Sequence, residues 1–168
     1  AQYKMGDDAD ATPWAVHELV LQTAPDQMGP IEDQLIAMLE LPGATHEAKE
    51  YCFRILDRIG SDRSVPTVAK FLADEKLALY ARRSLEFRKG SKLAGEGLVR
   101  ALPQLPDDLK IGVIGSLGRR GDVSAVTAIA PYVSSENVAL AKAALFALGQ
   151  LGGDQAHAAI MGATVTRD

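Results

Sequence analysis

Apolar residues recur at helical spacing around four leucines of the chain, Leu56, Leu85, Leu117 and Leu148. Successive leucines are 29, 32 and 31 residues apart. The positions eight and four residues before each leucine are also apolar or small: Ala48 and Cys52, Leu77 and Ala81, Leu109 and Val113, Leu140 and Ala144. Because residues spaced by four lie on one helix face, the pattern predicts four amphipathic helices that bury this face. A period of about thirty residues is typical of a helical repeat protein.

Each of these helices is followed by a glycine-bearing turn and a second apolar segment. The turn glycines, which we expect to end the first helices in the left-handed conformation, are Gly60, Gly90, Gly118 with Gly121, and Gly152 with Gly153. Asp62, Asp122 and Asp154 follow them as predicted N-caps of the second helices. Residues 12–22 and 29–43 predict a fifth, divergent helix pair with Trp14 as its large core residue. The fold class is therefore all-α, an α-solenoid of about five stacked antiparallel helix pairs.

Two stretches carry a resemblance to a known family. "HEAKEYCFRILDRIGSDRSVPTVAKFLADEKLALYARRSLE" and "LKIGVIGSLGRRGDVSAVTAIAPYV" resemble HEAT repeats of the short bacterial type, also seen in phycobilin lyase-like repeats, and exported HEAT-repeat proteins of planctomycete type. The resemblance covers roughly residues 10–163. It implies an α-solenoid, usually exported and of unassigned biochemical function. We expect an N-terminal extension at residues 1–10 and a single HEAT-like solenoid over 11–168, with a longer array left open.

Composition bounds the location of the protein only weakly. The chain of 168 residues is 47% hydrophobic and 24% charged, and its apolar runs end well before the roughly 18 residues that a membrane-spanning helix needs. The lone Cys52 excludes a disulfide within the chain, and its place on the apolar stripe favours a packing role. Because the chain begins at Ala1, we expect a processed, periplasmic or secreted protein, with a cytoplasmic location left open.

The sequence offers few residues for catalysis. Two His-Glu pairs, His17-Glu18 and His46-Glu47, invite comparison with the HEAT-fold deoxyhypusine hydroxylases, which bind iron through such pairs. The pairs are out of register with the repeat, so we expect surface positions in first helical turns. His157 stands alone in an alanine-rich segment, and no Ser-His-acid set can be assembled. We predict no enzyme, no metal and no cofactor.

Charge is distributed unevenly. Residues 1–48 carry one basic residue against nine carboxylates, for a net charge of −8, whereas residues 49–120 carry fifteen against nine, for +6. Seven cations fall in or beside three successive predicted turns, where we expect them to form one basic ridge: Arg58, Arg63, Arg88, Lys89, Lys92, Arg119 and Arg120. Replacing Arg88, Lys89, Arg119 and Arg120 with glutamate is expected to leave the fold nearly unchanged.

We therefore predict a non-enzymatic protein-binding scaffold. Its partner, a protein of unknown identity and acidic if the ridge binds it, would contact the concave helix face, including Tyr132, and the basic ridge. An anion-binding module for nucleic acid or acidic polysaccharide is the alternative. An aromatic content of 5% is low for base stacking and disfavours nucleic acid. A metal-dependent enzyme that uses the His-Glu pairs is the third hypothesis.

Overall fold

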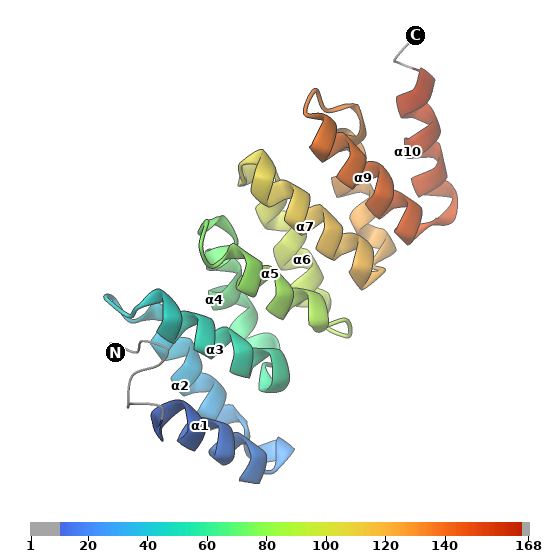
Figure 1. Cartoon of the computed structure of the whole chain (residues 1–168). Coiled ribbons are helices and arrows are strands. Elements are labelled where there is room, and N and C mark those ends of the chain that lie inside the picture. Colours follow the sequence, from blue (N-terminus) through green and yellow to red (C-terminus); the bar gives the residue numbers. More distant parts are fainter. Residues whose placement is uncertain (1–10, 166–168) are drawn as a thin grey trace. The chain divides into compact units, whose positions relative to one another are not determined.

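The computed structural model describes residues 11–165, and this part of the chain is all-helical, without a strand (Figure 1). None of its helices is long and apolar enough to cross a membrane. Short 3-10 turns precede or follow several of the helices. The ten α-helices of the described residues are α1 (Ala11–Gln22), α2 (Gly29–Glu40), α3 (His46–Ile59), α4 (Val65–Lys70), α5 (Ala78–Phe87), α6 (Lys92–Ala101), α7 (Asp107–Arg120), α8 (Val126–Ile129), α9 (Val138–Leu151) and α10 (Gly153–Val165).

The chain forms two compact units, Ala1–Ser84 and Leu85–Asp168, with the boundary inside α5. In unit 1, α2 packs against α3 and α4. Leu39, Leu56 and Val68 fill the core between these helices, at 0 or 1% exposure. The rings of Phe53 and Phe71 meet edge to face beside them, with centroids 5.5 Å apart.

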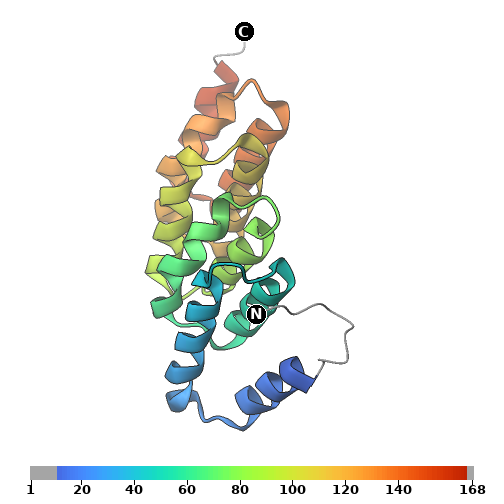
Figure 2. The same cartoon turned by 90° about the vertical axis from the view of Figure 1, so that its left-hand side faces the viewer.

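Helix α1 diverges from α2 and does not bury its largest residue (Figure 2). Val20 is its buried side chain, whereas Trp14 is 65% exposed. The two residues are six positions apart, which places them about 120° apart around the helix and so on different faces. The expectation that Trp14 is a core residue is therefore wrong.

In unit 2, α7 and α9 run side by side in close contact (Figure 1). Gly118 of α7 faces Ala147 of α9 so closely that a Cβ at Gly118 would lie 3.0 Å from the Cα of Ala147. The absence of a side chain at this position allows the two backbones to approach. Helix α10 packs on the other side of α9 and on the 3-10 turn Ala130–Ser134.

The predicted core positions are confirmed except for Leu109, which is half-buried. The four leucines that mark the repeat are at most 1% exposed. The small column four residues before them is buried as well, at 3% or less: Cys52, Ala81, Val113 and Ala144. The apolar stripe read from the sequence is thus the buried face of α3, α5, α7 and α9.

The turns follow the predicted chemistry only in part. Gly121 ends α7 in the expected left-handed conformation, with φ 77° and ψ 17°. Gly152 ends α9 with a positive φ of 66° but with ψ −167°, outside the left-handed helical region, so its predicted conformation is wrong. Gly60, which ends α3, is extended, with φ −64° and ψ 132°, so its predicted left-handed conformation is wrong. The reason is that the next turn begins at once with an extended residue, Ser61.

The predicted aspartate caps are also corrected. In unit 1 the start of the second helix is held by Glu32 of α2, whose buried carboxylate accepts from the backbone N–H of Ser61 and of Ser64 at 2.8 and 3.2 Å. Asp62 is the first residue of the 3-10 turn Asp62–Ser64, which leads into α4, and Ser61 is the N-cap of this turn. In unit 2 the carboxylate of Asp122 accepts from Arg120. The Asp122 carboxylate therefore binds the Arg120 guanidinium and does not cap the backbone that follows it.

Candidate functional site

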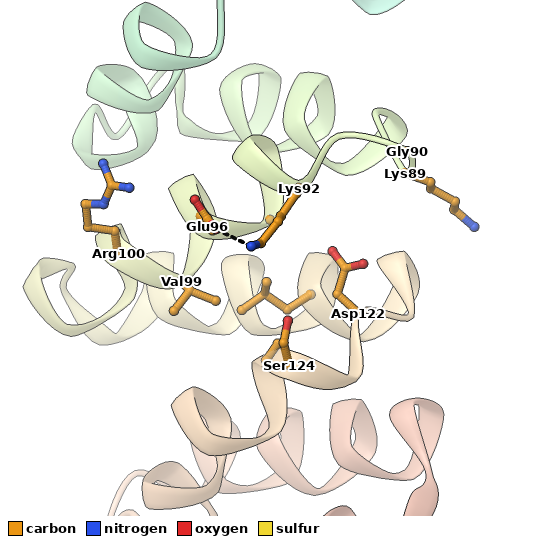
Figure 3. Close-up of a pocket in the computed structure, with 11 residues that line it drawn as sticks. Lys89, Gly90, Lys92, Glu96, Val99, Arg100, Asp122 and Ser124 are labelled. Carbon is orange, nitrogen blue, oxygen red and sulfur yellow. Dashed lines mark ion pairs between the residues drawn. The ribbon is translucent and has the colours of Figure 1, made fainter. Parts of the chain in front are cut away.

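Unit 2 contains an open pocket of about 640 Å³ between α6 and the turn that leads into α8 (Figure 3). Its floor is apolar and small, because Leu117 and Ala125 are almost fully buried beneath it and Val99 completes one side. Charged side chains surround this floor. The charged lining residues are Lys89, Lys92, Glu96, Arg100 and Asp122.

Helix α6 supplies one wall of the pocket. Ser91 begins this helix, and its hydroxyl accepts from the backbone N–H of Ala94 at 3.0 Å. Lys92, Glu96 and Arg100 then follow at intervals of four, so they form one row along the helix. Figure 3 shows Lys92 and Glu96 side by side and Arg100 at the far end of α6. The row reads cation, anion, cation.

The ion pair within this row is exposed and long. Lys92 Nζ lies 3.6 Å from Glu96 Oε1, and the two side chains are 92% and 47% exposed. A solvated pair of this kind contributes little and exchanges readily with other partners. Both groups are therefore available to a ligand.

A glycine brings α6 close to the opposite wall. A Cβ at Gly95 would lie 2.7 Å from Asp122 Oδ2 and 3.4 Å from Arg120 Nη2. A side chain at this position would therefore either displace the Asp122 carboxylate from Arg120 or push α6 away from the turn that holds Asp122. The closeness of the two walls depends on this residue.

Arg120 holds the rim of the pocket from below. Its side chain is fully buried, and its Nη1 donates to the carbonyls of Leu85 and Arg88 at 2.7 and 2.8 Å. Nη2 donates to the carbonyl of Ser91 at 2.7 Å, and Nε donates to Asp122 at 2.8 Å. These carbonyls lie at the end of α5 and in the turn that carries Lys89. Arg120 is therefore a side-chain cap for that turn.

This position corrects the expectation for Arg120, which cannot lie on an exposed ridge. Arg120 stands three residues after Leu117, so it falls on the same helix face as the buried leucine. The sequence therefore held a signal that the predicted ridge overlooked. Reversing its charge would bury a carboxylate against three carbonyls, so the predicted structural neutrality of the four-residue replacement is wrong.

Arg119 is also committed within unit 2. Its Nε and Nη2 donate to the two oxygens of Glu86 at 2.6 and 2.8 Å, and Ser116 Oγ donates to the same carboxylate at 2.7 Å. The hydrogen bonds that Arg119 donates to Glu86 keep the pKa of Arg119 above its ordinary value, although partial burial opposes the shift. The pair ties α5 to α7, which gives it a structural role.

The remaining predicted site residues are dispersed. Arg58 is exposed in the last turn of α3, and Arg63 is exposed and paired with Asp33, both within unit 1. In unit 2, Arg88 is half-buried, and Tyr132 is half-buried with the Lys110 ammonium 5.6 Å from its ring centroid. Only two of the eight residues predicted for partner binding, Lys89 and Lys92, are among those that line the described pocket. A continuous ridge through both units stays a prediction.

Two pocket residues were missed from the sequence. Glu96 and Arg100 lie outside the predicted turns, so the predicted ridge does not include them. The signal that could have found them is the spacing in "KLAGEGLVR", where three charged residues of alternating sign are four apart.

The candidate metal and thiol residues are not among those that line this pocket. His17 is half-buried with its ring 6.2 Å from that of Trp14, and His46 is exposed in the first turn of α3. Within residues 11–165, no three His, Cys, Asp or Glu residues are placed to hold a metal ion. His157 is exposed on α10. Burial raises the pKa of the Cys52 thiol to about 12.

No family model matches this chain, and no curated protein matches its sequence. The resemblance to HEAT repeats therefore stays a prediction from the sequence.

Proposed function

We propose that the protein is a non-enzymatic scaffold that binds an extended, acidic segment of a partner protein in the pocket of unit 2. The observation that carries this proposal is the combination of an apolar floor with three cations at the rim, Lys89, Lys92 and Arg100. Apolar side chains of a segment would be buried on the floor, while its carboxylates would meet the rim. Opposite charges of this kind speed association and fix the register of the bound chain.

The charge balance of the pocket supports an acidic ligand. Asp122 is engaged with buried Arg120, and Glu96 is paired with Lys92. Within the described part of the chain, Lys89 and Arg100 have no ion-pair partner. A ligand that brings two carboxylates would therefore find two unpaired cations.

We further propose that the two units continue one another as one HEAT-like solenoid, as the thirty-residue period predicts. In such a solenoid the second helices of successive repeats line one face. The pocket lies between α6 and the turn into α8, which are second-helix elements of neighbouring repeats. A groove at this place suits an extended chain better than a compact small molecule.

The other two hypotheses have weaker support. An anion-binding module would need many cations in a row, because polyanion affinity grows with the number of neutralised charges. Here the pocket is lined by three cations and two carboxylates, which leaves an excess of one positive charge. A metal-dependent enzyme would rely on His17 and His46, which lie on separate helices and differ in exposure.

The proposal is tested by blocking the pocket. Ser124 is exposed at its edge, so Ser124→Trp would fill the groove, and Ser134→Trp at an exposed position outside it is the matched control. Proteins captured from the native source should be lost with Ser124→Trp and with high salt, and retained with Ser134→Trp. Equal capture by both variants would reject the pocket as the binding site. Retention on heparin that depends on Ser124 would favour the anion-binding alternative.

A further inference from the structure

We infer that the pocket selects its partner by the order of charges, binding segments that present acidic, basic and acidic side chains on one face. This inference rests on the proposed function and names the class of segment that would bind. Lys92, Glu96 and Arg100 set the order, because they present cation, anion and cation along one wall of the groove. A complementary ligand must carry the opposite sign at each position.

The spacing of the row matches an extended chain. Residues four apart on a helix are about 6 Å apart along its axis, since each residue rises about 1.5 Å. In an extended chain, alternate residues share one face and are about 6.6 Å apart. A segment with an acidic residue, a basic residue two positions later and an acidic residue two positions after that therefore aligns with Lys92, Glu96 and Arg100 in turn.

Glu96 is the residue that makes the site selective. Without it, the wall would attract any acidic chain in proportion to its charge. With it, a carboxylate opposite the middle of α6 would face a like charge, while a lysine there would replace Lys92 as the partner of Glu96. Lys92, 92% exposed, would then be released to bind the first carboxylate of the ligand.

Three synthetic peptides of identical composition test the order. Each has two glutamates and one lysine separated by alanines, in the orders acid–base–acid, base–acid–acid and acid–acid–base. Because net charge and length are equal, only the arrangement differs. By fluorescence anisotropy at low salt, the acid–base–acid peptide should bind the wild-type chain about fivefold more tightly than the other two.

A charge-reversed protein provides the converse test. The triple variant Lys92→Glu, Glu96→Lys, Arg100→Glu changes exposed side chains and should retain its helical circular dichroism. It should lose the preference for the acid–base–acid peptide and bind a base–acid–base peptide more tightly. Lys142→Glu, exposed on α9 and outside the pocket, makes the same change in net charge and should leave the wild-type preference intact.

The outcomes separate the two proposals. If the wild-type chain binds all three peptides equally and Ser124→Trp abolishes that binding, charge order is overturned while the pocket remains the site. If Lys142→Glu shifts the preference as much as the triple variant, the selectivity comes from net charge and the inference fails. If no peptide binds and Ser124→Trp leaves capture of native partners unchanged, both proposals fail.

Discussion

Removing the guanidinium of Arg120 should destabilise unit 2 strongly. Arg120→Met keeps most of the apolar stem and volume but deletes four hydrogen bonds, three to carbonyls and one to Asp122. Breaking a buried ion pair by removing one partner costs about 3–5 kcal/mol, because a charge is left without compensation. The side chain of Asp122 is 33% exposed, so water compensates part of its charge and the cost falls toward the lower end of this range. The carbonyl of Arg88 still accepts from the N–H of Ser91 at 2.9 Å, which favours the lower end of this range. The loss is a large share of the roughly 5–15 kcal/mol that stabilises a typical domain.

Urea unfolding followed by far-ultraviolet circular dichroism measures this loss, and hydrogen exchange locates it. The amides of residues 88–91 should exchange much faster in the variant, while those of α2 and α3 in unit 1 should be unchanged. Arg58→Met is the matched control, because this arginine is exposed in the last turn of α3. Its expected effect is within about 0.5 kcal/mol.

A second substitution tests the electrostatic origin of the effect. In the Arg120→Met background, Asp122→Asn removes the uncompensated carboxylate and should recover part of the lost stability. A loss below about 1 kcal/mol for Arg120→Met, or no recovery with Asp122→Asn, would refute the role assigned to the buried guanidinium.

Three further predictions concern the core and the turns. Gly118→Ala should lower the free energy of urea unfolding by about 1–2 kcal/mol, because the contact of the new Cβ with Ala147 outweighs the helix propensity of alanine. Gly149→Ala, at the equivalent position of α9 with no described atom within 4 Å of the new Cβ, should raise it by roughly 0.5–1 kcal/mol. Changes of the same sign in the two variants would contradict the close packing of α7 on α9. Burial acts to raise the pKa of Glu32, but hydrogen bonds from Ser61 and Ser64 outweigh it and hold the pKa below 4.5. The stability from this depressed pKa is therefore present above the unfolded pKa and lost as pH falls through the folded pKa. Glu32→Gln should flatten the stability profile as the pH falls below about 5, and an unchanged slope there would assign the pH dependence elsewhere. Cys52, with its pKa near 12, should react with a disulfide reagent at neutral pH only after denaturation, and prompt labelling of the native protein would show that α3 opens.

The core was predictable because it depends on local spacing alone. Leu117 and the residues four and eight before it define a helical face without any knowledge of what packs against it, and the burial of Leu117 follows. The direction of Arg120 could have been read in the same way, since it continues that face. The prediction of an exposed position fails because it rests on the rule that charged residues in turns are solvated, whereas the Arg120 guanidinium is paired inside the structure.

The pocket was not predictable from the repeat, because it depends on contacts between segments about thirty residues apart. The charge row on α6 is visible in the sequence, but the opposite wall comes from Asp122, Ser124 and Ala125. Their distance from α6 is set by Gly95, whose missing side chain admits Asp122 and Arg120. Spacing along one helix carries no information about such an approach. Glu32 escaped prediction for the same reason, since it caps a turn 29 residues later.

The reach of Arg120 back to the turn after α5 makes the pocket a property of the junction between two successive helix pairs. A copy of α5 and α6 alone would carry Lys89 and the charge row of α6 but would lack the arginine that fixes the rim and the residues that form the second wall. Duplication of a single repeat within a gene would therefore create a new groove only where the following repeat places an arginine after its buried leucine. In such an array, a single substitution that adds or removes this arginine in one repeat would create or abolish a binding groove on the repeat before it. The charged row on α6 that contacts the partner could change independently.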